Sequence, residues 1–92
     1  MDLMNEIIQV GDIQIIHGKG VVIGGALLIE DITPESYIGK TIRIINPDNS
    51  TIITTVLDVM INSSIIDKKN IFFLLSEDIS DLIMIHAKVQ LR

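Results

Sequence analysis

The chain has 92 residues, the size of one domain, and we expect a single domain over residues 1–92. Hydrophobic residues make up 48% of the chain, isoleucine alone accounts for more than a fifth, and aromatic residues are only 3%. This hydrophobicity excludes a disordered chain. The absence of cysteine excludes a disulfide framework, a thiolate metal site and a thiol nucleophile. Because β-branched side chains pack well on a pleated surface, the composition favours strands.

The formal net charge is −5, and the seven basic residues are scattered: Lys19, Lys40, Arg43, Lys68, Lys69, Lys88 and Arg92. Clustered cations are what binds a nucleic-acid backbone, so this distribution argues against a nucleic-acid partner. Met1–Val10 lacks the basic and apolar regions of a secretory signal. The longest apolar run, Val21–Ile29, is about half of a membrane-spanning helix. We therefore expect a cytoplasmic protein with no membrane association.

Six strands are predicted from period-two alternation and from short apolar runs bounded by turn residues. In chain order they are Glu6–Ile16, Gly20–Ile29, Thr41–Ile45, Ile53–Ile61, Asn70–Ser76 and Ile83–Leu91. A single helical turn is predicted at Thr33-Pro34-Glu35, and no internal repeat is evident. Closing the sheet into a barrel would remove the exposed edge strands that such an isoleucine-rich sheet would otherwise present. The predicted fold is all-β, a small closed six-stranded barrel with Greek-key connections.

Two of these strands alternate clearly enough to predict which face is buried. The first is expected to bury Ile53, Thr55, Leu57, Val59 and Ile61, with Thr54, Asp58 and Met60 outward. The second is expected to bury Ile83, Ile85, Ala87, Val89 and Leu91, with Met84, His86, Lys88 and Gln90 outward. Apolar residues remain on outward positions, namely Ile45, Val56, Met60 and Met84. They either form a contiguous interface or are scattered singly.

Turn chemistry marks two connections. Asn46–Asn49 is predicted to be a tight turn, in which Pro47 fixes φ and the Asn and Asp side chains bond their own backbone. Gly18 and Gly20 suit a turn with positive φ, and the pair Gly24 and Gly25 suits a bulge or close packing. The alternative for these glycines is a backbone that faces a ligand, although their spacing matches neither a P-loop nor a dinucleotide fingerprint.

The segment Ile8–Ala26, IQVGDIQIIHGKGVVIGGA, resembles the opening of the second domain of elongation factor Tu and related translational GTPases. It keeps that family's order of glycine, basic residue, glycine, two valines and a later glycine, here from Gly18 to Gly24. Weaker similarity follows at Ile38–Ile44, Thr54–Met60, Asp67–Leu75 and Ile79–Leu91, so the resemblance covers nearly the whole chain. It implies a freestanding β-barrel domain that binds protein or RNA.

The sequence also departs from that family. It has no nucleotide-binding domain and no P-loop Lys with Ser or Thr, so GTP hydrolysis is not carried over. Met84, Ile85 and His86 replace the family's final Arg-Gly-Gln turn, and a site for the end of a tRNA is not carried over either.

Candidate residues for catalysis or metal binding are few. His17 and His86 lie in no ligand or nucleophile motif, so we interpret them as surface histidines rather than as ligands or bases. The acidic segment Ser76–Asp81 either attracts a cation or is a solvated turn. The same two alternatives apply to the acidic group Glu30, Asp31 and Glu35. We predict no catalytic residue, no cofactor-binding residue, no metal ligand and no cofactor.

Three functions stay open. The first is a non-enzymatic protein-interaction module that binds a protein partner or itself as a homo-oligomer. The second, which the charge disfavours, is a translation-linked binder of tRNA or ribosomal RNA. The third, ranked last, is a small enzyme or metal protein that uses the acidic segments.

Overall fold

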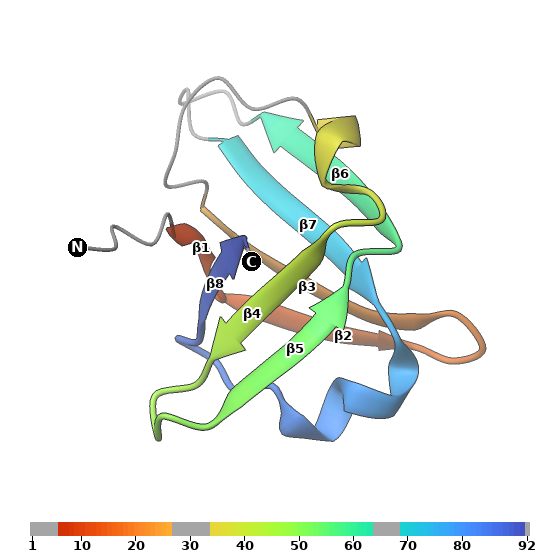
Figure 1. The fold of residues 1–92 in the computed structure, drawn as a ribbon. Coiled ribbons are helices and arrows are strands. Elements are labelled where there is room, and N and C mark those ends of the chain that lie inside the picture. Colours follow the sequence, from red (N-terminus) through yellow and green to blue (C-terminus); the bar gives the residue numbers. More distant parts are fainter. Residues whose placement is uncertain (1–5, 27–33, 64–68, 92) are drawn as a thin grey trace.

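The computed structural model describes residues 6–26, 34–63 and 69–91, which form strands and two short 3-10 helices (Figure 1). The elements are β1 Glu6–Gln9, β2 Asp12–Ile16, β3 Gly20–Ala26, η1 Pro34–Tyr37, β4 Thr41–Ile45, β5 Thr51–Thr55, β6 Asp58–Ser63, β7 Lys69–Leu75, η2 Glu77–Leu82 and β8 Lys88–Leu91. The all-β class is therefore confirmed, and the predicted helical turn is η1. Two predicted pieces lie outside the described residues, namely residues 27–29 of the second predicted strand and Thr33 of the predicted helical turn.

The strands form two antiparallel sheets of four. Sheet A has the order β1-β8-β4-β5 and sheet B the order β2-β3-β7-β6. Figure 1 shows β4 and β5 crossing in front of β3 and β7, so the sheets pack face to face at an angle. The prediction of a closed six-stranded barrel is therefore wrong. The described residues form eight strands in two sheets, because two of the predicted strands are each divided in two.

The first division falls at Val10, between β1 and β2. The Val10 backbone continues the pairing with the β8 side, since its N–H donates to Ala87 O (2.7 Å) and its carbonyl accepts from His86 N (2.8 Å). The next N–H, that of Gly11, donates instead to Gly24 O (2.8 Å) on β3. Asp12 also faces Gly24 in the register, so two residues oppose one, as in a β-bulge. The chain thus turns a corner from sheet A into sheet B.

The second division falls at Val56, between β5 and β6, and repeats this geometry. Val56 N donates to Lys40 O (2.9 Å) and Val56 O accepts from Gly39 N (2.8 Å), whereas Leu57 N donates to Leu74 O (2.8 Å). Asp58 faces Leu74 as well. The extra residue at this corner reverses which residues point inward.

This reversal explains the wrong faces predicted for Ile53–Ile61. Val59 and Ile61, after the corner, pack against the core as predicted. Up to and at the corner the buried residues are Ile52 and Val56, whereas the predicted inward residues Ile53 and Thr55 are exposed, and so is Leu57 just after the corner. A single alternation drawn through the corner cannot be correct on both sides of it.

The two corners belong to an internal repeat of the whole fold. Three strands, a 3-10 helix and one strand occur twice in succession, and each sheet order reads the same when the two halves are exchanged. The matching corners have related sequences, Val10-Gly11-Asp12-Ile13 and Val56-Leu57-Asp58-Val59. The residues that bond to them, Gly39 and His86, both have positive φ, 83° and 73°. This is a repeat of topology, and apart from these corners no corresponding repeat is evident along the sequence.

The last predicted strand, Ile83–Leu91, is shorter than expected. Only Lys88–Leu91 is strand, because a turn with Ala87 N bonded to Met84 O (3.2 Å) precedes it. The predicted inward residues Ile83, Ala87 and Val89 are buried, but Ile85 and Leu91 are 43% and 44% exposed. Gln90, predicted to face outward into solvent, is buried.

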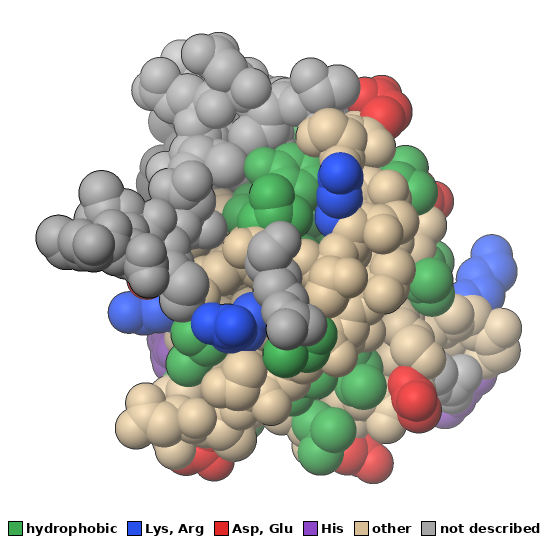
Figure 2. Space-filling model, viewed as in Figure 1, with side chains coloured by type: hydrophobic (Ala, Val, Ile, Leu, Met, Phe, Trp, Pro, Cys, Tyr) green, Lys and Arg blue, Asp and Glu red, His purple; other side chains and the backbone are tan. Residues whose placement is uncertain are grey.

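Sheet A presents a mixed outer face. Its strands β4 and β5 bury alternate residues, Ile42, Ile44 and Ile52, and turn mainly Thr and Arg side chains outward together with Ile45 and Ile53. Figure 2 shows hydrophobic side chains there in small separate groups among polar surface. Exposed apolar residues scattered in this way are ordinary on a protein surface.

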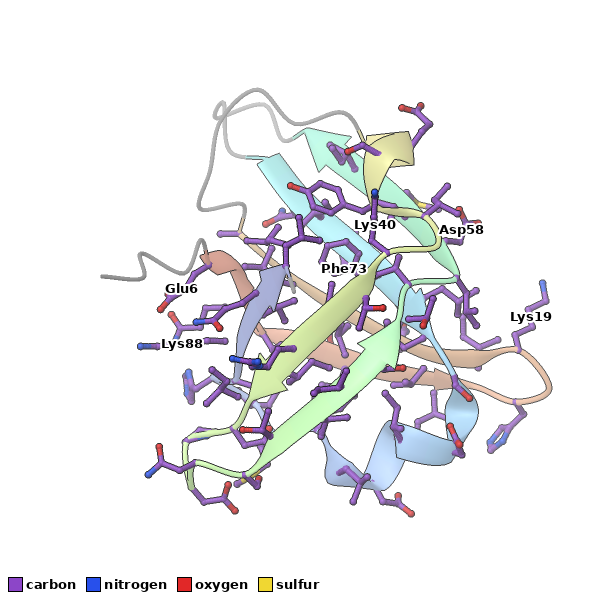
Figure 3. The ribbon with its side chains drawn as sticks, in the orientation of Figure 1. Glu6, Lys19, Lys40, Asp58, Phe73 and Lys88 are labelled. Atoms are coloured by element: carbon purple, nitrogen blue, oxygen red, sulfur yellow. The ribbon has the colours of Figure 1, made fainter. Side chains whose placement is uncertain are left out.

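The core fills the space between the sheets. Sheet A contributes Ile7, Ile42, Ile44, Ile52 and Val89, and sheet B contributes Val21, Ile23, Ile71, Phe73 and Leu75. Phe73 is fully buried, projects from β7 between the sheets (Figure 3) and meets Tyr37 edge to face, with ring centroids 5.9 Å apart. Such aromatic pairs stabilise a core beyond the area that they bury.

The β4–β5 turn is fixed by the buried side chain of Asn46. Its Nδ2 donates to Leu82 O (2.8 Å) and Ser50 Oγ (2.9 Å), and its Oδ1 accepts from Met84 N (2.9 Å). Asp48 accepts from Ser50 N (2.9 Å) and Oγ (2.6 Å), which lowers the pKa of the Asp48 carboxyl. The predicted tight turn is confirmed, and Asn46 also ties it to the end of η2.

Replacing Asn46 tests this connection. Asn46→Ala leaves Leu82 O and Met84 N, whose bonds to Asn46 are part-buried, without that partner. An unpaired group costs about 1–3 kcal/mol when it is buried and less where water reaches it, so we expect the free energy of unfolding, measured in urea, to fall by about 1–3 kcal/mol. Ser50→Ala removes the two bonds of the Ser50 hydroxyl, with Asp48 and with Asn46 Nδ2, but keeps the bonds of Asn46 to Leu82 and Met84. It is therefore the matched control, with an expected loss below about 1 kcal/mol. Equal losses in the two variants would contradict the role assigned to Asn46.

Titration of Tyr37 tests whether its side chain is buried in the core. Burial raises the pKa of its hydroxyl above the ordinary value, so the folded state holds this proton more tightly than the unfolded state does. This contribution to stability is fully present below about pH 10 and is lost as the pH rises through the folded pKa. Tyr37 is the only tyrosine and tryptophan is absent, so near-ultraviolet absorbance reports this group alone. An apparent pKa at or below 10.0 in the folded protein would contradict its burial.

Candidate functional site

The outer face of sheet B carries two rows of side chains that cross all its strands. The register places Asp12, Gly24, Phe72 and Met60 in one row, and Gln14, Val22, Leu74 and Asp58 in the next. Opposite residues in such a row have Cβ atoms about 4.5–5.5 Å apart, so their side chains touch. The centre of the face, on β3 and β7, is apolar.

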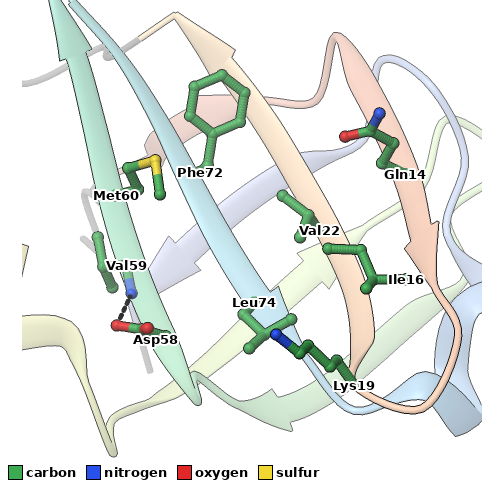
Figure 4. Close-up of a pocket in the computed structure, with 9 residues that line it drawn as sticks. All are labelled: Gln14, Ile16, Lys19, Val22, Asp58, Val59, Met60, Phe72 and Leu74. Atoms are coloured by element: carbon green, nitrogen blue, oxygen red, sulfur yellow. Dashed lines mark hydrogen bonds between the residues drawn. The ribbon is translucent and has the colours of Figure 1, made fainter.

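This face is hollowed into a groove of about 470 Å³, which we call the outer groove (Figure 4). It is lined by Gln14, Ile16, Lys19, Val22, Asp58, Val59, Met60, Phe72 and Leu74. Met60 is 63% exposed, and Val22, Phe72 and Leu74 are half-buried. The groove is therefore an apolar surface open to solvent, in contrast to the mixed face of sheet A.

Glycine at position 24 gives the groove part of its shape. A Cβ atom built on Gly24 would clash with the ring of Phe72, so this ring lies over the glycine on the neighbouring strand. Gly25 has a different neighbour, since a Cβ there would clash with the backbone carbonyl of Gln9 beneath the first corner. Close packing, one of the two roles predicted for this glycine pair, explains both positions. Gly18, in the hairpin before β3, has a φ of 83° as predicted.

Charged and polar groups surround the apolar centre. In Figure 4 the Lys19 side chain extends from the β2–β3 hairpin toward Leu74, and Asp58 lies on the far side of Leu74. Asp58 Oδ1 accepts a hydrogen bond from Val59 N (2.8 Å), and Gln14 occupies the β2 side. One amide and two opposite charges give the groove recognition groups but no assembled nucleophile and base.

The structure does not bring the sequence-predicted candidates together. His17 lies in the β2–β3 turn and His86 in the turn before β8, and both are exposed. In the acidic segment, now largely η2, Asp78 and Asp81 are exposed. Glu35 is exposed on η1, and Glu30 and Asp31 lie outside the described residues. Within residues 6–26, 34–63 and 69–91, no three His, Asp or Glu side chains form a group that could hold a metal.

The apolar residues predicted to face outward separate in the structure. Met60 lines the outer groove, and Met84 is 42% exposed in the turn before β8. Ile45 is half-buried on sheet A, and Val56 is buried at the second corner, so its predicted outward position is wrong. Only Met60 of the four belongs to the groove.

Sequence reasoning missed the floor of the groove. Val22 lies in the predicted strand Gly20–Ile29, and Phe72 and Leu74 lie in the predicted strand Asn70–Ser76, which we expect from its length to be a buried strand. Both strands contain runs that are apolar on both faces. Such runs are typical of strands covered on both sides. The available signal was that no helix or further strand was predicted to cover the second face.

Comparisons with protein-family models, with curated proteins and with solved structures found no match for this chain. Among the described residues, no helix combines the length and apolarity needed to cross a bilayer.

A pair of adjacent substitutions tests the glycine geometry. Gly25→Ala directs a methyl group at the Gln9 carbonyl, which belongs to the rigid backbone of the corner, whereas Gly24→Ala meets a half-exposed ring that can rotate away. Overpacking of this kind costs about 1–3 kcal/mol. We expect Gly25→Ala to lower the unfolding free energy in urea by more than Gly24→Ala does. The reverse order would contradict the close approach of β1 to β3.

Proposed function

We propose that the chain is a non-enzymatic protein-interaction module that binds its partner in the outer groove of sheet B. The observation that carries this proposal is a contiguous apolar floor, Val22, Phe72, Leu74 and Met60, left open on one sheet. Contiguous exposed apolar surface of this kind marks binding sites. The groups around it, Lys19, Asp58 and Gln14, supply specificity without a catalytic arrangement.

Met60 is the strongest candidate for an anchoring residue. Its side chain is the most exposed of the large hydrophobic side chains in the described residues, and it lies on an edge strand beside Phe72. Taking such a side chain fully out of water contributes about 1.5–3 kcal/mol. Methionine is also flexible and polarizable, which lets it fit partners of different shape.

Kinship with the second domain of elongation factor Tu and related translational GTPases is part of this proposal. It is supported by the glycine-bounded hairpin from Gly18 to Gly24 and by the weaker similarities that follow it in the sequence. A cytoplasmic location is likewise proposed, in keeping with a chain that has no cysteine. GTP hydrolysis is not part of the proposal.

RNA binding is the less supported alternative. Lys19, Lys40 and Lys88 are labelled in Figure 3 and project from different parts of the molecule, Lys19 from the β2–β3 hairpin and Lys88 from β8. Lys88 also lies 3.6 Å from Glu6, with Nζ facing Oε1. Phosphate binding needs several cations on one face, and salt-dependent binding to RNA would be its signature.

Two matched substitutions test the docking surface. Met60→Lys places a charge at the groove, and Ile53→Lys places one at an exposed isoleucine of sheet A, 48% exposed. Partners captured by the wild-type chain are identified by mass spectrometry, and their affinities are then measured by isothermal titration calorimetry. We expect Met60→Lys to weaken binding about tenfold or more, and Ile53→Lys to leave it unchanged. A partner that is weakened by Ile53→Lys alone would contradict the site.

A further inference from the structure

Two carboxylates stand at opposite corners of the outer face of sheet B. Asp12 begins β2 and Asp58 begins β6, and these are the two outer strands of the sheet. Asp12 shares its row with Met60, whereas Asp58 shares the neighbouring row with Gln14. The carboxylates are therefore placed diagonally, with the apolar floor between them. Both side chains are exposed.

The distance between the two corners follows from sheet geometry. Three strand spacings of about 4.8 Å separate β2 from β6, and two residues along a strand add about 6.7 Å. The diagonal between Asp12 and Asp58 is therefore about 16 Å. This span is fixed by the register of the sheet rather than by side-chain conformation.

Neither carboxylate is neutralised within the described part of the chain. Asp58 accepts a hydrogen bond from its neighbour Val59 N (2.8 Å), and the ion pair described above joins Lys88 to Glu6 on sheet A. The net charge of the chain is −5. A partner with two cations, one for each corner, has electrostatic complementarity to Asp12 and Asp58, whereas a second copy of the chain would bring further acidic corners against these carboxylates.

The apolar floor also restricts the backbone of the partner. β3 and β7 are each paired on both sides, so their peptide groups are not available to a chain laid across them. An extended segment crossing this floor would bury its own N–H and C=O groups without partners. A helix satisfies those groups internally.

We propose that the outer groove binds an amphipathic helix of another protein, which packs apolar side chains on Phe72 and Met60 and presents basic side chains to Asp12 and Asp58. This inference rests on the proposed function and specifies the chemistry of its partner. At 1.5 Å per residue, about 16 Å corresponds to about 11 residues. Eleven residues are about three turns, so basic residues at i and i+11 lie on the same helix face as the apolar residues between them.

Three synthetic helical peptides test this inference by fluorescence anisotropy. The first has two leucines on one face of an alanine-rich helix, flanked on that face by lysines at i and i+11. The second has glutamates in place of these lysines, and the third carries the lysines on the opposite face. We expect the first peptide to bind about tenfold more tightly than the others, with an advantage that declines as salt is added.

Two double variants assign that advantage to the corners. Asp12→Asn with Asp58→Asn is expected to abolish the preference for the lysine-flanked peptide. Asp78→Asn with Asp81→Asn, which removes two exposed carboxylates of η2, makes the same change in net charge and is expected to leave the preference intact. A preference that survives the first double variant, or one that both double variants abolish equally, would overturn the inference.

The remaining outcomes separate this inference from the proposed function. If Met60→Lys weakens all three peptides equally and the charges have no effect, the groove binds protein but the basic helix is wrong. If no peptide binds, or if sedimentation shows that the chain dimerises and that Met60→Lys makes it monomeric, the inference is overturned as well. If Met60→Lys affects neither a peptide nor a captured partner, the proposed function fails too.

Discussion

Backbone pairing at two buried valines determines the architecture of this protein. Val10 and Val56 each bond through N–H and C=O to one sheet, and the following residue bonds to the other sheet. Both side chains are buried, so the core holds each corner in place. A long strand can pass from one sheet to another only if such a bend satisfies its backbone groups. The division into two sheets and the repeated topology both depend on this arrangement.

The corners also create the candidate site. Each corner places an aspartate at the start of an outer strand of sheet B, and each directs one extra residue at the neighbouring central strand, opposite Gly24 and Leu74 respectively. The two rows of the outer face are thus related by the internal repeat. η1 packs against β6, and η2 packs against β3 and β2. On the outer face Val22, Phe72 and Leu74 are nevertheless only half-buried and Met60 is exposed, so the centre of this face stays open. The outer groove is therefore a consequence of the two corners at Val10 and Val56.

The sequence was sufficient for the positions of most strands but not for the corners. Thr41–Ile45 was predicted with its observed bounds, because apolar residues alternate there between clear turn signals. The continuous alternation from Ile53 to Ile61 concealed a bulge, since Leu57 is compatible with either face. The groove could not be predicted because Phe72 and Leu74 lie in a run that is apolar on both faces, and only the arrangement of elements shows which face is covered. Asn46 was recognised as a turn residue, but its bonds to residues 36 and 38 positions away depend on the tertiary fold.

The two halves of the repeat differ most where the groove lies. The inward pairs Ile13 and Val59, Val21 and Ile71, and Ile23 and Phe73 remain apolar, because both halves share one core. The outward pairs diverge, Gln14 with Met60, Val22 with Phe72, and Gly24 with Leu74. Gly24 leaves room for the ring of Phe72, and the divergence makes the β6–β7 side of the face the more apolar one. The repeat therefore supplies two symmetric acidic corners, whereas the floor between them is asymmetric, so the proposed amphipathic helix would meet different surfaces in its two opposite directions.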